Sequence, residues 1–321
     1  MRVVFMGTPA FAVPTLRALV EAGHEVVSVL SQPDRPVGRG RHLTAPPVKV
    51  AALELGLDVF QPHRVKDPQA FGHLEAARAD VFVVVGYGQI VPRAVIDLPL
   101  LGCVNVHASL LPKYRGAAPI HWAIVRGETT TGVTTMLIEE RLDAGDMLLE
   151  RETPIGPDET AVDLAARLAP MGADLAIETL AGLQDGLITP RKQNDAEATL
   201  APILKREDGK IDWGLPAGQI FNRVRGFVPW PGSYTSFRGK RLHIHRARPH
   251  ASPRAGDSPG PGLISASGDE VRVCCGEGTI LQIEEVQMEG KKRMAAADFL
   301  HGRQPRENER LGDETLGKET P

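Results

Sequence analysis

The sequence predicts an α/β protein in which a parallel-sheet domain is followed by a smaller β-rich domain. In the first half, continuous apolar segments alternate with stretches of helical periodicity, which is typical of a parallel sheet covered on both faces. In the second half, short segments of alternating polarity are separated by Gly-rich turns. The length of 321 residues fits two domains, and 42% hydrophobic residues can build a substantial core.

The first domain is predicted from five apolar strands and three helices. Gly and Pro residues bound several of these segments, as expected for turns and helix ends. The strands are expected at residues 2–6, 25–31, 80–88, 103–107 and 132–138, and the helices at 11–22, 119–126 and 160–184.

The second domain is expected to contain one helix and at least four short strands. The helix is predicted at residues 217–227, and the strands at 233–237, 241–249, 270–275 and 280–288. The stretch from residue 308 is polar and predicts a frayed end. We therefore expect a first domain at 1–187, a linker at 188–206, a second domain at 207–311 and a polar tail at 312–321.

Charge is distributed unevenly along the chain, although its formal net value is only -3. Residues 205–254 hold eleven Lys or Arg against three acids, whereas residues 128–200 hold fifteen acids against five bases. A basic segment of this size favours a polyanionic partner, and a solvated basic surface is the alternative. No apolar run reaches the ~18 residues of a membrane span, and the start of the chain has no signal-peptide pattern, so we expect a cytoplasmic protein.

Several familiar kinds of site are not supported by the sequence. The first strand is followed by GTPAFA, not by the GxGxxG of dinucleotide-binding proteins, and there is no P-loop, GxSxG or HExxH. Cys103, Cys274 and Cys275 have no zinc-ligand spacing, and we expect them to be structural thiols. His243 and His245 lack a third ligand nearby, so no metal site is predicted.

A polar face on one apolar strand marks the predicted site. In CVNVH, side chains alternate, so Cys103, Asn105 and His107 share one face, with His107 at the strand's carboxyl end. Ligands of parallel sheets bind at that edge. With Asp143 or Asp146 of the later RLDAGD segment, this set suits acyl transfer to an amine. An amide and an imidazole can stabilise an oxyanion and move a proton, and a carboxylate can orient the imidazole.

The same residues carry a resemblance to a known family. NVHASLLPKYRGAAPIHWAI, followed by TGVTTMLIEERLDAGDML, resembles the 10-formyltetrahydrofolate-dependent formyltransferases. GTPAFA, SQPDRPVGRGRHLTAPPVK, VFVVVGYGQIVP, DGKIDW and FVPWPGSYT narrow the resemblance to members whose acceptor is initiator methionyl-tRNA. It covers nearly the whole chain except the tail.

The resemblance implies a Rossmann-like formyltransferase domain, an OB-like domain that helps to hold tRNA, and 10-formyltetrahydrofolate as co-substrate without a metal. It implies no membrane and no obligate protein partner, and we expect a monomer. Its catalytic residues fall on Asn105, His107 and Asp143. Folate contacts are implied for Ser109, Leu110, Leu111, Pro112 and Ile90, and tRNA contacts for Arg35, Arg39, Arg41, Lys49, Lys205 and Arg206.

Four other interpretations remain open from the sequence. Related enzymes formylate a sugar-nucleotide amine or glycinamide ribonucleotide, or hydrolyse formyl-folate, and would share the Asn, His and Asp without needing a basic second domain. A catalytically silent RNA-binding module would explain the charge but not the polar face of CVNVH.

Overall fold

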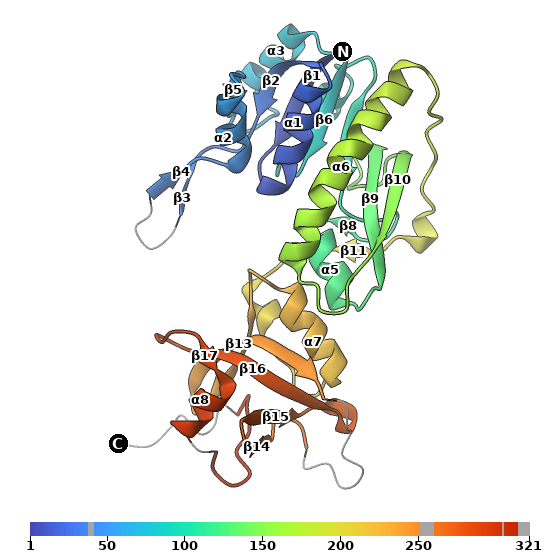
Figure 1. Ribbon diagram of the computed structural model, residues 1–321. Coiled ribbons are helices and arrows are strands. Elements are labelled where there is room, and N and C mark those ends of the chain that lie inside the picture. The colour runs from blue at the N-terminus through green and yellow to red at the C-terminus, as the bar shows by residue number, and fades with distance from the viewer. Residues whose placement is uncertain (38–41, 251–259, 304, 314–321) are drawn as a thin grey trace. The chain divides into compact units, whose positions relative to one another are not determined.

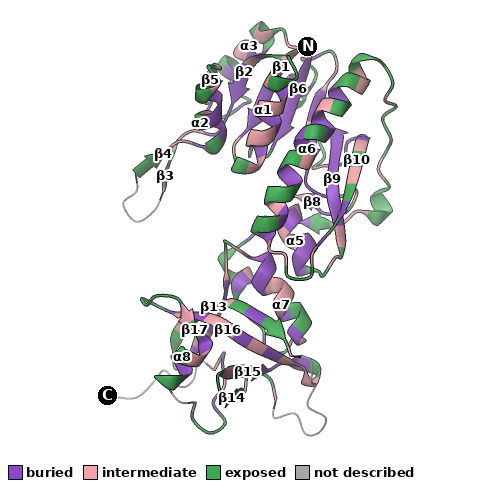
Figure 2. Cartoon of the chain, viewed as in Figure 1, coloured by how far each residue is buried: buried purple, intermediate pink, exposed green. Residues whose placement is uncertain are grey.

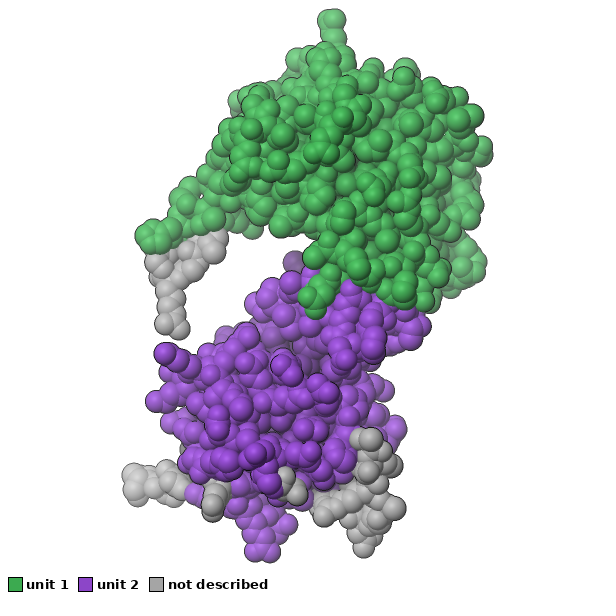
Figure 3. All heavy atoms as spheres, viewed as in Figure 1, with its two compact units in different colours: residues 1–119, 130–154, 163–202 green, residues 120–129, 155–162, 203–321 purple. Residues whose placement is uncertain are grey.

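The protein is described by a computed structural model that covers residues 1–37, 42–250, 260–303 and 305–313. The chain divides into two compact units, coloured separately in Figure 3. Unit 1 comprises residues 1–119, 130–154 and 163–202, and unit 2 comprises 120–129, 155–162 and 203–321. The segments 120–129 and 155–162 are flanked in the sequence by residues of unit 1. They nevertheless belong to unit 2, with the later part of the chain.

Unit 1 is built on a seven-stranded sheet in the order β10-β9-β7-β6-β1-β2-β5. Its strands are β1 (Arg2–Gly7), β2 (Glu25–Leu30), β5 (Val59–Phe60), β6 (Val81–Val85), β7 (Cys103–His107), β9 (Thr130–Leu137) and β10 (Met147–Pro154). Its helices are α1 (Val13–Glu21), α2 (Pro47–Glu54), α3 (Pro68–Ala77), α4 (Arg93–Ile96) and most of α6 (Ala161–Gln184). A short 3-10 turn, Ala10–Ala12, precedes α1.

Helices cover both faces of the sheet, as the sequence predicts. Leu74 of α3 and Ile96 of α4 pack with Cys103, Phe82 and other strand residues in one apolar cluster. On the other face, a Cβ built on Gly172 of α6 would lie 2.9 Å from Val106, so helix and strand are in close contact. Between these layers β1, β6 and β9 are almost wholly buried, as Figure 2 shows. Continuous apolar sequence is therefore what β1 and β6 require.

The sheet is mixed, and here the expectation of a parallel sheet is wrong for one edge. β5, β2, β1, β6 and β7 are parallel, but β9 pairs antiparallel with β7, and β10 antiparallel with β9. His107 lies opposite Thr134, in the middle of β9, so β9 begins beyond the carboxyl end of β7 and runs back alongside it. A parallel strand would need a crossover to the opposite edge. β10 was not predicted, because MLLERETP carries charges that hide its apolar alternation.

The polar stretch predicted as a linker, residues 188–206, is structured over much of its length. Arg191 forms a backbone bridge with Met147, and β11 (Leu200–Ala201) pairs in parallel with β8 (Arg115–Gly116). Between them lies a 3-10 turn, Asp195–Glu197. Residues 191–201 thus run back along unit 1, and we call them the strap. Backbone pairing needs no apolar pattern, which is why the sequence did not predict it.

The basic segment after β2 forms a hairpin at its base. β3 (Arg35–Val37) pairs antiparallel with β4 (His42–Thr44). Arg39 and Arg41, the two predicted tRNA contacts between these strands, lie outside the described residues. No helix within the described part of the chain is long and apolar enough to cross a membrane.

Unit 2 contains the β-rich fold that the sequence predicts. Figure 1 shows its antiparallel sheet with α7 and α8 beside it. The strands are β12 (Ser233–Phe237), β13 (Lys240–Pro249), β14 (Ile264–Ser267), β15 (Glu270–Cys274), β16 (Ile280–Met288) and β17 (Met294–Ala295), with 3-10 turns at Arg206–Gly209 and Gly276–Gly278. The helices are α5 (Pro119–Val125), α7 (Ala217–Gly226) and α8 (Ala296–His301). The core includes Trp213, whose Nε1 donates to Thr235 Oγ1 at 3.0 Å, and Phe237, whose ring centroid lies 5.1 Å from that of Phe299.

The end of the chain is ordered further than its polar composition predicts. Arg238 Nε and Nη2 donate to the two carboxylate oxygens of Glu309 at 2.6 and 2.8 Å, and the Glu309 side chain is 1% exposed. Leu311 is buried in the core of unit 2. The expectation of a frayed end from residue 308 is therefore wrong as far as Leu311, because a bidentate ion pair with the buried Glu309 carboxylate holds the segment.

The Glu309–Arg238 pair makes unit 2 sensitive to acid. The hydrogen bonds from Arg238 lower the pKa of Glu309 below its usual 4.5. The stabilisation is fully present above the unfolded-state pKa and is lost as pH falls through the lower, folded-state value. We expect Glu309→Gln to destabilise the protein by ~1–3 kcal/mol at neutral pH and less at about pH 3. Urea unfolding across this pH range measures both effects. Glu307→Gln, at an exposed neighbour, is the control, and equal losses in the two variants would contradict the assignment.

Candidate active site

His107 is held at the carboxyl end of β7 in a buried position. Its residue exposure is 6%, and its Nε2 lies 2.9 Å from the carbonyl oxygen of Tyr114. A carbonyl only accepts, so Nε2 carries a proton and donates it to Tyr114 O. This bond fixes the orientation of the ring and leaves Nδ1 as the other polar atom of the imidazole.

Asp143 faces that second nitrogen. Its Oδ2 lies 3.8 Å from His107 Nδ1 and accepts a hydrogen bond from the backbone N–H of Gly116 at 2.8 Å. The separation of 3.8 Å is too long for a direct hydrogen bond but short enough for strong electrostatic attraction to a protonated ring. Asp143 has a φ of +47°, which few non-glycine residues adopt. The structure therefore brings together His107 and Asp143, two of the three predicted catalytic residues.

Asn105 lies two residues before His107, on the same face of β7. It is half-buried and sits opposite Met136 of β9 and Val84 of β6. Asp146, the other acid of RLDAGD, contributes its carbonyl to the backbone of β9 by accepting from Leu137 N–H at 2.9 Å. Among the residues that the structure describes, Asp143 is the acid that meets His107.

Cys103, the third residue on this face, is not a nucleophile. Burial raises the pKa of its thiol to about 12, so the thiolate is scarce at neutral pH. Its Sγ lies 3.7 Å from the carbonyl oxygen of Ile96. The expectation of a structural thiol agrees with this environment.

The loop after His107 is anchored by Thr134 of β9. The Thr134 hydroxyl donates to the Ser109 carbonyl at 2.7 Å and accepts from Leu111 N–H at 3.1 Å. Ser109 Oγ donates to Lys113 O at 2.7 Å. Ser109 and Leu111 are buried, whereas Leu110 and Pro112 are partly exposed and Ile90, in the loop after β6, is 86% exposed. The folate contacts predicted at these five positions stay predictions.

The basic residues predicted to touch tRNA differ in their surroundings. Lys49 Nζ donates to both carboxylate oxygens of Asp34, at 2.8 and 2.9 Å, and Arg35 donates to Gln32 Oε1 at 3.0 Å. These bonds hold the base of the β3–β4 hairpin. In unit 2, Lys205 and Arg206 are exposed. Their contacts with tRNA also stay predictions.

Sequence reasoning missed the groups that support the site. Tyr114 acts through its carbonyl, Gly116 through its N–H, and Gln193 through a side chain that meets the Asp143 loop. Gly116 has a φ of +124°, and a Cβ there would lie 2.6 Å from Ala201 O. The only available signal was the turn-like YRGAAP, which predicts a tight backbone without saying what it holds.

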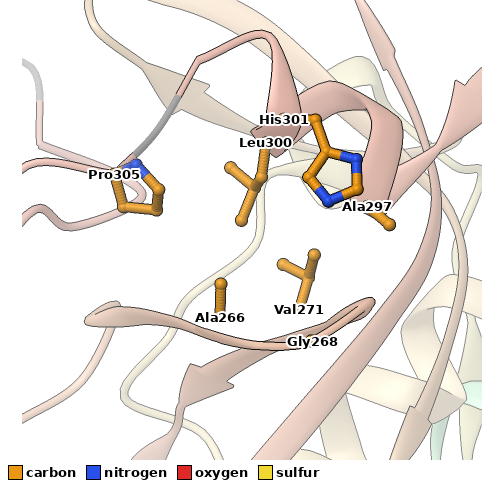
Figure 4. Close-up of a pocket in the computed structure, with 7 residues that line it drawn as sticks. All are labelled: Ala266, Gly268, Val271, Ala297, Leu300, His301 and Pro305. Atoms are coloured by element: carbon orange, nitrogen blue, oxygen red, sulfur yellow. The ribbon is translucent and has the colours of Figure 1, made fainter.

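Unit 2 carries a hollow of a different character. Figure 4 shows the side chains of Ala266, Val271 and Leu300 directed toward a common space, with His301 and Pro305 beside it. Gly268 and Ala297 complete the lining. This mainly apolar hollow holds none of the amide, imidazole and carboxylate groups of the candidate site.

Two family models match this chain, one in its first half and one in its second half. The formyl transferase family model matches residues 1–180, and the model for the formyl transferase C-terminal domain matches residues 203–304. The methionyl-tRNA formyltransferase of Solibacter usitatus is 59% identical over 98% of this chain and 99% of its own. The chain belongs to the methionyl-tRNA formyltransferases. The Acidobacterium capsulatum member is 53% identical over 97% of this chain and all of its own.

Solved structures that resemble this formyltransferase share its fold. A sugar 3N-formyl transferase, WlaRD, crystallised in the presence of dTDP and 5-N-formyl-THF, superposes with a TM-score of 0.65 at 16% identity over 91% of this chain and 99% of that one. HypX from Aquifex aeolicus, solved with tetrahydrofolic acid, gives a TM-score of 0.60 at 19% identity over 94% of this chain and 47% of that one. The Rossmann-like first domain and the β-rich second domain are thereby confirmed.

Thr134→Val should destabilise the protein and loosen the loop after His107. The valine keeps the shape of the side chain but leaves the buried Leu111 N–H without an acceptor, which costs ~1–3 kcal/mol. Thr131→Val, on the same strand, is the matched control, because the buried Thr131 hydroxyl has no hydrogen-bond partner within the described residues. The free energy of unfolding, measured by chemical denaturation, should be clearly lower for Thr134→Val than for Thr131→Val. Equal stabilities would show that the Thr134 hydroxyl does not anchor the loop.

Proposed function

We propose that this formyltransferase transfers the formyl group of 10-formyltetrahydrofolate to the α-amine of methionine esterified to initiator tRNA. The observation that carries the proposal is the meeting of His107 and Asp143 beside Asn105 at the end of β7. The folate donor is supported by the family match and by the folates named with the two solved relatives.

The proposed reaction needs no enzyme nucleophile. The free amine attacks the formyl carbon, a tetrahedral oxyanion forms, and the bond from that carbon to N10 of the folate breaks. One proton leaves the amine and one arrives at N10, so atoms and charge balance. The chain's task is to stabilise the oxyanion and to move that proton.

The three residues have distinct roles in this proposal. The Asn105 amide donates a hydrogen bond to the developing oxyanion. The Nε2–H of His107 is committed to Tyr114 O, so the Nδ1 side, which Asp143 shares, handles the charge and proton of the reacting atoms. Asp143 holds the ring in place, and its negative charge faces the positive charge that the ring takes up when it receives a proton.

The tRNA acceptor is supported by a basic and aromatic surface on unit 2. On β12 and β13, the Arg241 guanidinium lies 4.4 Å from the centre of the Tyr234 ring, and the rings of Tyr234 and His243 are 5.9 Å apart. Burial and the charges of His245, Arg241 and Arg206 lower the pKa of His243. Rings that stack on bases, with arginines for phosphates, are what single-stranded RNA requires.

Comparing acceptors tests the function directly. Purified protein is incubated with 10-formyltetrahydrofolate and initiator tRNA that is either charged with methionine or uncharged, or with an amino-sugar nucleotide or glycinamide ribonucleotide. The proposal is supported if formylated methionine is recovered from the reaction with charged tRNA and no other acceptor is formylated. Transfer to a small amine in preference to tRNA, or formate release without an acceptor, would favour the related activities instead.

Asn105→Ala and His107→Ala should each lower kcat far more than they change KM for the folate. Loss of one group that stabilises charge in the transition state costs ~2.7–4 kcal/mol, or about 100- to 1,000-fold in rate. Steady-state kinetics on variants with normal thermal unfolding measure this. A decrease in kcat of less than about tenfold would contradict the catalytic assignment.

Arg206→Ala and Arg241→Ala should weaken tRNA binding and flatten its salt dependence. Removing one phosphate-binding side chain reduces the slope of log affinity against log salt by roughly one unit or somewhat less. Arg246→Ala serves as the control, because the Arg246 guanidinium is already paired with Glu284 on β16 at 2.8 Å. Equal slopes for wild type and all three variants would remove this surface from the proposed tRNA site.

A further inference from the structure

Asp143 is brought to His107 by a loop that folds back along the sheet, and the position of this loop depends on contacts with other segments. β9 runs antiparallel to β7, so its end at Leu137 lies opposite Val104, at the start of β7 and away from His107. The loop 138–146 that follows must therefore fold back to bring Asp143 to the other end of the strand. Within the described residues, the Asp143 carboxylate is fixed by a single hydrogen bond, from Gly116 N–H.

Gln193 of the strap holds the backbone of this loop. Its Nε2 donates to the carbonyl oxygens of Asp143 at 2.9 Å and of Gly145 at 2.8 Å, one on either side of Ala144. Both amide hydrogens are used, so the two carbonyls are kept at a set spacing. Most of the strap's first half is exposed, but Gln193 is half-buried because its side chain turns inward to the loop.

Arg115 fixes the other end of the Gln193 amide. Its Nε and Nη2 donate to Gln193 Oε1 at 3.0 and 2.8 Å, and Nη2 also reaches Asp195 Oδ1 at 2.8 Å. Arg115 is 8% exposed. These charge-assisted bonds determine which end of the amide carries the donors, so the N–H groups must point to the Asp143 loop.

The strap also holds the opposite side of the imidazole. Thr199 Oγ1 accepts from Tyr114 N–H at 2.9 Å, and Thr199 O accepts from Arg115 N–H at the same distance. Tyr114 O is the acceptor for His107 Nε2. One segment of eleven residues, 191–201, thus positions the carbonyl on one side of His107 and the carboxylate on the other.

We propose that Gln193 is a positioning residue for formyl transfer, which acts by holding the Asp143 loop against His107. This inference rests on the proposed function and assigns the strap, a segment without catalytic groups of its own, a role in the rate of the chemical step.

Gln193→Met removes the amide while keeping the length of the side chain. Misplacing a catalytic group by about 1 Å can cost on the order of 100-fold in rate, so we expect kcat to fall about 10- to 100-fold. KM for folate and for tRNA should stay within about twofold, since neither is bound by Gln193 in this proposal. Gln193→Glu is the second variant: it keeps the oxygen for Arg115 but loses the donors, and should show the same kinetic pattern.

Glu197→Gln is the matched control within the strap. Glu197 accepts from Asn194 Nδ2 at 2.9 Å, a hydrogen bond that stays inside the strap, so the kinetics of this variant should equal those of wild type. Wild-type transfer in the same assay establishes the function itself. If wild type forms no formylmethionine, the proposed function fails; if wild type is active, the Gln193 variants decide the inference.

A double-variant cycle separates positioning from a general loss of structure. In an Asp143→Asn background, Gln193→Met should reduce kcat by less than about threefold, because the group it positions has already lost its function. An undiminished effect in that background, or wild-type kcat in both Gln193 variants, would overturn the inference.

Discussion

The site depends on holding one imidazole from two sides. His107 donates from Nε2 to Tyr114 O, while Asp143 faces Nδ1 from a loop on the other side. A buried imidazole without a partner would be costly, and one with a single partner would be free to tilt. Two partners on separate loops define the ring's orientation, so every element that places those loops contributes to the chemistry.

The antiparallel edge of the sheet is the first such element. β9 and β10 form a hairpin whose loop carries Asp143, and Thr134 of β9 anchors the segment that follows His107. The strap is the second, since it pairs with β8 and meets both loops. Gly116 joins them: its N–H binds Asp143, and its absent side chain lets Ala201 approach. A larger residue there would separate strap and site.

Patterns of buried sequence predicted the central fold well. β1, β6 and β7 are continuous apolar segments because helices cover both faces, and their polar exceptions, Asn105 and His107, marked the site. The direction of β9 could not be predicted, because an apolar strand has the same pattern whichever way it runs. The composition of the strap predicts a linker, since its bonds are made by backbone and by isolated polar side chains. Gln193 in particular looks like any surface glutamine until the Asp143 carbonyl is placed beside it.

The paired hold on His107 can be observed directly by nitrogen-15 NMR of histidine-labelled protein. Of the ten histidines, His107 is identified by the signal that His107→Gln removes. We expect a proton on Nε2 that exchanges slowly with water, because it is buried and bonded to Tyr114 O. A neutral ring protonated only at Nδ1, or an Nε2 proton in fast exchange, would contradict the account.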